Sequence, residues 1–113
     1  MNPDGDAIGS MLAMRIFLEK LGKKATMVCS DPVPEKYAFL PGAGEILPCE
    51  AIIQGQFDIG FALDCGDIDR LGKAQKYLKE AKLSICIDHH DTNTGYADLN
   101  LILPEAAATA EII

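Results

Sequence analysis

The sequence has few basic residues and no apolar stretch long enough to cross a membrane. Lys and Arg number 10 against 17 Asp and Glu, the net charge is −7, and the basic residues form no cluster. A basic cluster is the usual footprint of proteins that bind nucleic-acid duplexes, so that class is disfavoured. No run approaches the roughly 20 apolar residues of a transmembrane helix. Asp4 and Asp6 also stand where a secretion signal would carry basic residues. We therefore expect a cytoplasmic protein without a membrane span.

Closely spaced cysteine pairs are also missing. The four cysteines are Cys29, Cys49, Cys65 and Cys86, and no two of them form a C-x-x-C motif. Three lie in or beside apolar runs, which predicts reduced, buried thiols rather than a disulfide or zinc framework. Cys65 stands out because it directly follows Asp64.

Apolar patterning predicts an alternation of helices and strands along the 113 residues. A helix is expected over about 6–21, covered on much of its circumference, with Arg15, Glu19 and Lys20 toward water. Residues 30–56 should be mainly loop, with one turn of helix near Tyr37. Strands are predicted at 25–29, 57–64, 83–88 and about 98–103, a second helix at 68–81, and the start of a third after Pro104.

This order of elements predicts an α/β fold, a doubly wound and mostly parallel sheet with helices on both faces. The strands at 57–64 and 83–88 are apolar throughout most of their length, which is typical of buried parallel strands. The chain begins at a loop-to-helix junction and ends inside a predicted helix. We therefore expect a fragment truncated at both ends.

Acidic and histidine side chains gather where this fold would bind a ligand. Ligands of open parallel sheets lie at the carboxyl ends of the strands. Six side chains are predicted at or near that edge: Asp4, Asp6, Asp64, Asp88, His89 and His90. Crowded carboxylates repel one another, and a pair of divalent cations would remove that conflict. Oxygen-rich ligation with histidine suits Mn²⁺ or Mg²⁺ better than structural zinc. Two such ions about 3.5–4 Å apart can generate hydroxide for an in-line attack on phosphorus.

Each acidic residue taken alone has a simpler interpretation. Asp6 could cap the first helix, and Asp4 could serve the turn formed with its neighbouring proline and glycine. Asp64 could begin a loop, and a lone histidine is usually structural or exposed. The combination of D-x-D, a strand-terminal Asp and Asp-His-His favours the metal interpretation.

Three segments resemble known motifs. "NPDGDAIGS" resembles motif I, "ALDCGD" motif II and "IDHH" motif III of the DHH phosphoesterase superfamily. "DRLG" after motif II also matches this superfamily. "PEKYAFLPG" and "AAATAEII" further resemble the branch of bifunctional oligoribonucleases and pAp phosphatases, the nano-RNases. The resemblance covers essentially the whole chain. It implies that residues 1–113 are a partial DHH domain, and that a C-terminal substrate-binding domain lies outside this chain.

The resemblance also implies roles for individual residues. Asp4 would ligate one Mn²⁺ and Asp6 a second, Asp64 would bridge the two ions, and His89 would complete the second site. Mg²⁺ or Co²⁺ are alternative metals. His90 would face the scissile phosphate or its nucleophile, and Asp88 would orient the histidines. At the start of the first helix, Gly9 and Ser10 would let a phosphate approach backbone N–H groups, with close helix packing as the alternative.

The expected activity is Mn²⁺-dependent hydrolysis of short single-stranded RNA and of pAp (3′-phosphoadenosine 5′-phosphate) by a hydroxide that two metals activate. Alternatives are a cyclic-dinucleotide phosphodiesterase, a manganese pyrophosphatase or a non-catalytic truncated DHH module. The family's motif I histidine would fall just before Met1, and the fourth motif is missing. The parent is thus expected to be an enzyme and this fragment to be impaired. The sequence leaves a homodimer open.

Overall fold

The computed structural model describes residues 4–49 and 57–113. The helices are α1 (Gly5–Lys20), α2 (Gln75–Glu80) and α3 (Thr109–Ile112), with the 3-10 helices η1 (Glu35–Tyr37), η2 (Ala43–Glu45) and η4 (Ile68–Ala74). The strands are β1 (Val28–Cys29), β2 (Leu47–Pro48), β3 (Ile59–Leu63), β4 (Leu83–Asp88) and β5 (Leu99–Ile102). The predicted turn near Tyr37 is confirmed as η1. The predicted loop at 50–56 lies outside the described residues.

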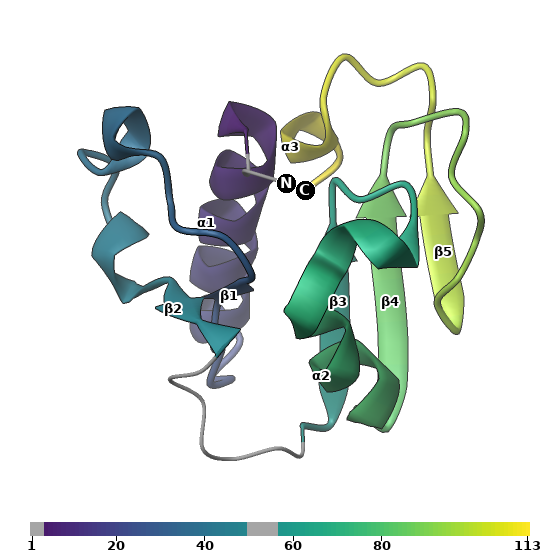
Figure 1. The fold of residues 1–113 in the computed structure, drawn as a ribbon, viewed down its shortest axis with the longest axis horizontal. Helices are drawn as coiled ribbons and strands as arrows, with labels where there is room; N and C mark the ends of the chain where they lie inside the picture. The colour runs from purple at the N-terminus through teal and green to yellow at the C-terminus, as the bar shows by residue number, and fades with distance from the viewer. Residues whose placement is uncertain (1–3, 50–56) are drawn as a thin grey trace.

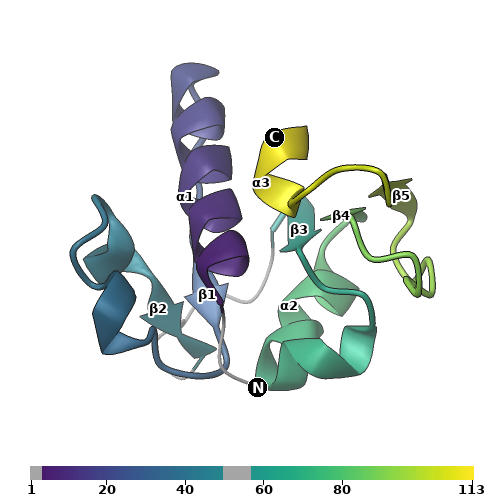
Figure 2. The ribbon, with the colours of Figure 1, turned by 90° about the horizontal axis from the view of Figure 1, so that it is seen from above.

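The strand pairs of the described residues are all parallel. β3, β4 and β5 form one sheet in that order, and β1 pairs with β2 in a second, smaller sheet. Figures 1 and 2 show α2 on one face of the larger sheet and α3 on the other, with α1 beside α3. The predicted α/β class, with parallel strands and helices on both faces, is confirmed. The described strands are divided between two sheets, where the element order had predicted one.

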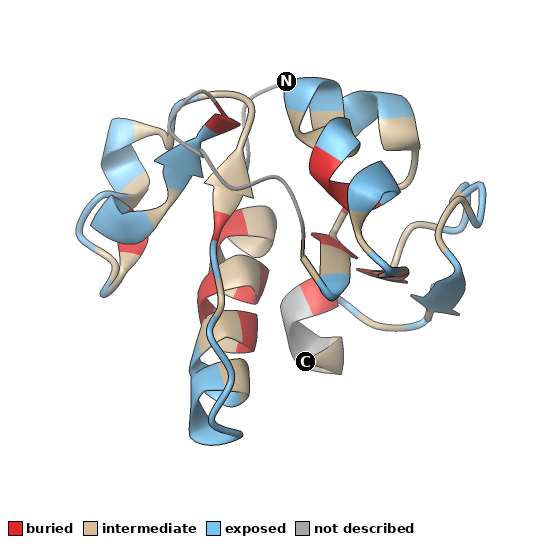
Figure 3. Cartoon of the chain, turned by 90° about the horizontal axis from the view of Figure 1, so that it is seen from below, coloured by how far each residue is buried: buried red, intermediate tan, exposed pale blue. Residues whose placement is uncertain are grey.

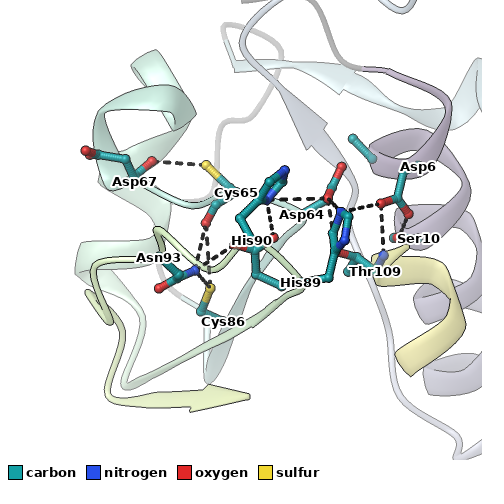
Figure 4. A network of polar contacts seen from close by, with 12 residues as sticks. Asp6, Ser10, Asp64, Cys65, Asp67, Cys86, His89, His90, Asn93 and Thr109 are labelled. Carbon is teal, nitrogen blue, oxygen red and sulfur yellow. Dashed lines mark hydrogen bonds and ion pairs between the residues drawn. The ribbon is translucent and has the colours of Figure 1, made fainter. Parts of the chain in front are cut away.

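α1 matches its predicted span closely, and its capping residue is Asp4. The Asp4 carboxylate accepts the N–H of Ala7 at 2.9 Å, which satisfies one of the N–H groups that the first turn of a helix leaves free. Asp6, the capping candidate from the sequence, lies inside the helix. Its side chain is therefore not used as the cap and points elsewhere (Figure 4).

The end of α1 is more exposed than predicted. Ile16, Phe17 and Leu21 have exposed fractions of 51%, 53% and 57%, so the prediction of a helix covered on much of its circumference is wrong there. Arg15, expected to face water, is instead largely covered and pairs with Glu45. The apolar residues of α1 lie on most of its sides, so the sequence pattern does not show which side packs against the rest of the protein.

β4 coincides with the predicted strand at 83–88, while the other strands are shorter than predicted. β3 keeps five of the eight residues predicted at 57–64, and Ile59 at its start is 47% exposed. The prediction that this strand is buried on both faces is therefore wrong at its amino end. β1 keeps only Val28–Cys29 of the strand predicted at 25–29. The last predicted strand is confirmed as Leu99–Ile102.

The helix predicted at 68–81 is broken at Gly72. The first half is the 3-10 helix η4 and the second the short helix α2, because Gly72 adopts φ 56° and ψ −132°. A Cβ at this position would lie 3.0 Å from the Ser30 hydroxyl oxygen, so glycine is needed for the close approach as well as for the positive φ. Ser30 in turn accepts the N–H of Ala74 at 3.1 Å, which fixes the break against the end of β1.

Two apolar clusters hold these layers together. The first contains Ile8, Leu12 and Met27 and packs α1 against the segment before β1. The second contains Ala62, Leu78 and Cys86 and packs α2 against β3 and β4. Figure 3 shows buried positions along α1 and at the start of α3, whereas β5 is exposed. The buried side of α1 and the start of α3 thus lie close to the carboxyl ends of β3 and β4.

The four cysteines are free, and Cys49, Cys65 and Cys86 are buried while Cys29 is half-buried. The prediction of buried thiols is therefore confirmed for three of the four cysteines. Burial raises the pKa of the Cys29 thiol to about 11 and also raises the pKa of Cys65. Both side chains are therefore neutral thiols at physiological pH. Among the described residues, no helix combines the length and the apolar character that crossing a bilayer requires.

Candidate metal centre

Asp64 lies where β3 ends, and its backbone turns sharply. Its N–H still donates to the carbonyl of Ile87 at 2.9 Å, so the residue extends the ladder between β3 and β4 by one step. Its φ is 57°, and it is the only non-glycine residue with positive φ in the described part of the chain. Aspartate tolerates this left-handed conformation better than most residues. Such strain is concentrated at functional sites. The side chain is only 4% exposed and points into the network of Figure 4.

Asp6 and His89 meet Asp64 from two other segments of the chain. The Nε2 of His89 lies 3.4 Å from Asp6 Oδ2 and 3.4 Å from Asp64 Oδ1. Asp6 comes from the first turn of α1, Asp64 from the end of β3, and His89 from the loop after β4 (Figure 4). Donor atoms about 2.1 Å from one cation lie about 3.0–3.4 Å apart in octahedral or tetrahedral geometry. The observed spacing therefore suits shared ligation.

His90 is oriented by Asp88 at the end of β4. His90 Nδ1 lies 2.6 Å from Asp88 Oδ1, and Asn93 donates to the other carboxylate oxygen at 2.8 Å. Asp88 is fully buried, and its carbonyl also accepts the N–H of Leu103 beside β5. Because a carboxylate only accepts hydrogen bonds, Nδ1 of His90 carries a proton. The His90 ring is 42% exposed and lies 3.9 Å from Asp64 Oδ1.

Burial and neighbouring charge raise the pKa of Asp64 to about 7. The largest cause is the loss of hydration on burial, which raises the pKa. The hydrogen bond from Thr109 acts in the opposite direction and lowers the pKa. The proximity and charge of Asp6 and the charge of Asp4 raise the pKa further. A carboxyl held this way gains a proton more easily than one in water. A bound cation would favour its ionised form instead, so the site is electrostatically prepared for positive charge.

The remaining predicted site residues lie around this group with different contacts. Asp4 is exposed and uses Oδ1 in the helix cap, and its proximity to Asp64 is apparent in the pKa of the latter. Ser10 is fully buried and donates its hydroxyl to Asp6 Oδ1 at 3.2 Å. A Cβ on Gly9 would meet nothing within 4 Å, so close packing does not explain that glycine. Metal binding by Asp4 and phosphate binding at Gly9 and Ser10 stay predictions.

Two residues of the network were not among the site residues predicted from the sequence, although Thr109 lies in the segment "AAATAEII" that resembles the nano-RNase branch. Thr109 at the start of α3 contacts both Asp6 and Asp64, and Asn93 contacts Asp88. Threonine and asparagine are common in structural positions, so the residue type alone does not assign either of them to a site. Only the fold brings them to the site.

The donor set fits a divalent cation. Asp64, His89 and His90 offer ligand atoms that all lie within 4.8 Å of one another, and Asp6 approaches His89 from α1. Two kinds of donor, carboxylate oxygen and imidazole nitrogen, suit Mn²⁺ as well as Zn²⁺ or Fe²⁺. The neighbouring Cys65 does not join this set, because its Sγ is directed at the Asp67 carbonyl at 3.1 Å.

Comparison with known proteins finds relatives that match this chain over nearly its whole length. The chain is 37% identical over its whole length to the bifunctional oligoribonuclease and PAP phosphatase NrnA of Thermus thermophilus, of which it covers 33%. A crystal structure of an exopolyphosphatase-related protein from Bacteroides fragilis superposes with a TM-score of 0.89 at 25% identity. That match covers 98% of this chain and 35% of the other. The chain therefore spans about a third of the length of each of these relatives. The family model described as "DHH family, N-terminal domain" matches residues 1–113, and the chain belongs to the DHH family.

Proposed function

We propose that this chain is the metal-binding part of an enzyme that hydrolyses phosphate esters of short RNA oligonucleotides and of pAp with the help of two Mn²⁺ ions. The observation that carries the proposal is the meeting of Asp6, Asp64 and His89, with both oxygen-to-nitrogen distances at 3.4 Å. The relative from Thermus thermophilus, whose name states oligoribonuclease and PAP phosphatase activity, supports the choice of substrate.

Divalent cations held there would neutralise charge on a phosphate and lower the pKa of an attacking water. The side chains of this chain would hold these cations. Asp6 and Asp64 provide carboxylate oxygens from two elements, and His89 lies between them. With Nδ1 of His90 engaged by Asp88, its Nε2 is left to hold or pass a proton at the exposed side of the group.

The charge of the chain limits the substrate. A protein with net charge −7 repels a long polyanion, so phosphate groups would be held chiefly where cations compensate them. This favours short single-stranded substrates and nucleotide phosphates over duplexes. The fold places no membrane-spanning helix among the described residues. We expect a substrate-binding domain beyond this chain to hold the nucleoside.

The test compares hydrolysis of a ribodinucleotide, pAp, pyrophosphate and cyclic di-AMP by the full-length parent of this chain, with Mn²⁺ present. We expect release of mononucleotide and of phosphate from the first two substrates. Asp64→Asn should lower both rates at least about 100-fold, because the central carboxylate is lost. Asp91→Asn, which changes an exposed residue of the loop after the histidines, is the matched control and should leave the rates unchanged.

If pyrophosphate is the sole good substrate, the enzyme is a pyrophosphatase. If cyclic di-AMP is the best substrate, it is a cyclic-dinucleotide phosphodiesterase. A folded protein that hydrolyses none of the four, with or without Mn²⁺, would point to a non-catalytic module. Each of these results contradicts the proposal.

A further inference from the structure

Thr109, the first residue of α3, joins the two carboxylates of the metal centre. Its backbone N–H donates to Asp6 Oδ2 at 2.9 Å, and its hydroxyl donates to Asp64 Oδ1 at 3.0 Å. The residue is fully buried, and Figure 4 shows it between the two aspartates. These contacts reach across 103 and 45 positions of the sequence, so they depend on the complete fold.

The oxygen atoms that Thr109 contacts are the ones that His89 approaches. Asp6 Oδ2 and Asp64 Oδ1 each lie 3.4 Å from His89 Nε2. Thr109 thus contacts both oxygens as a donor, and the same two oxygens face the imidazole. Because each carboxylate rotates freely unless a donor holds it, these two hydrogen bonds set the distance and orientation of the oxygen pair.

Asp6 receives a further contact that fixes its other oxygen. The buried hydroxyl of Ser10 donates to Asp6 Oδ1 at 3.2 Å. Asp6 is therefore held through both oxygens, whereas Asp64 depends on the Thr109 hydroxyl at the oxygen that His89 and His90 approach. Removal of that hydroxyl should disturb Asp64 more than Asp6, since the backbone N–H of residue 109 stays in place.

We propose that Thr109 is a positioning residue of the metal centre, whose N–H and hydroxyl hold Asp6 and Asp64 in the arrangement that binds a cation. This inference rests on the proposed function, in that it assumes the site binds Mn²⁺. Thr109 touches neither the metal nor the substrate in this role. It acts through the carboxylates, as residues that hydrogen-bond to metal ligands generally do.

The experiment is calorimetric titration of the metal-free protein with Mn²⁺ alone, well below its unfolding temperature. Thr109→Val keeps the shape and the N–H but removes the hydroxyl, and should weaken Mn²⁺ binding about 10–100-fold. Thr109→Ser restores the donor and should return the affinity to within about 3-fold of the wild type, on the same grounds. Ser84→Ala is the matched control, because it removes a buried hydroxyl at the opposite end of β4 and should leave the affinity unchanged.

A purely structural role for Thr109 gives a different pattern. It would lower the thermal stability of Thr109→Val while the folded protein kept its wild-type Mn²⁺ affinity, and that result overturns the proposal. Failure of both Thr109→Val and Thr109→Ala to fold would likewise show that the residue serves the fold. If the wild type itself gives no heat with Mn²⁺, the metal-binding function fails and the role of Thr109 falls with it.

Discussion

Replacing Asp64 by asparagine should stabilise the metal-free protein while it removes metal binding. Asparagine keeps the oxygen that accepts the Thr109 hydroxyl, and it tolerates the φ of 57° at this position. What it removes is a carboxylate whose pKa is raised from 3.8 to about 7 by burial and by the neighbouring acids. Above pH 7 that carboxylate is ionised in the folded chain at a cost in stability.

The size of the effect follows from the pKa. A rise of about 3 units corresponds to about 4 kcal/mol, and because water reaches part of the site we expect about 2 kcal/mol. The sign follows from proton linkage, because the pKa of Asp64 is higher in the folded than in the unfolded chain. The favourable contribution of protonated Asp64 to the free energy of unfolding is fully present below pH 3.8 and is lost as the pH rises through about 7. Asp64→Asn should therefore be more stable than the wild type at pH 8, and most of this difference should vanish at pH 5.

Urea unfolding of both proteins at pH 5 and pH 8, with chelator, measures the difference directly. Because both proteins share all other titrating groups, the change in the difference reports on Asp64. Addition of Mn²⁺ at pH 8 should raise the free energy of unfolding of the wild type only. A variant less stable than the wild type at pH 8 without metal, or a difference that grows on acidification, would refute the reasoning.

Three further predictions concern His90 and two glycines. Asp88→Asn should destabilise the protein by about 1–3 kcal/mol. It should also move the His90 proton from Nδ1 to Nε2, because an amide can offer its NH₂ to Nδ1. The ring ¹⁵N chemical shifts report the tautomer, and an unchanged tautomer would contradict this prediction. Gly72→Ala should cost about 1–3 kcal/mol in urea unfolding, since alanine disfavours its positive φ and its Cβ would press on Ser30; a stability equal to wild type would mean that the break is not required. Gly9→Ala should instead raise the free energy of unfolding by about 0.5–1 kcal/mol, because the position is helical and has open space around a Cβ. A simultaneous fall in hydrolysis would show that phosphate approaches there. A loss of stability would contradict the conclusion that a Cβ fits at this position.

The sequence was most informative where burial and local signals agree. The strand at 83–88 is apolar on both sides and bounded by polar residues, and β4 has those limits. α1 was predicted to within one residue at each end because its apolar run is bounded by acidic residues and Gly22. The placement of Asp64 and Asp88 at strand ends followed from the same patterns.

What the sequence could not show depends on contacts between distant segments. The break at Gly72 exists because Ser30 lies against it, and the regular spacing of apolar residues in 68–81 contains no trace of that contact. The exposed end of α1 has the same origin, since only the fold decides which of its apolar sides meets another element. Thr109 and Asn93 were not predicted as site residues because their residue types are common in structural positions.

The contacts of Thr109 also restrict cation binding to the folded state. They join α3 to the first turn of α1 and to the end of β3, so the cation-binding arrangement cannot exist before these three segments have come together. A cation that binds this arrangement would select the native state alone and, at about 100 times its dissociation constant, would add about 2.7 kcal/mol to the free energy of unfolding. Metal availability would then govern how often α1 and α3 separate, and with it the exposure of these two helices to proteases.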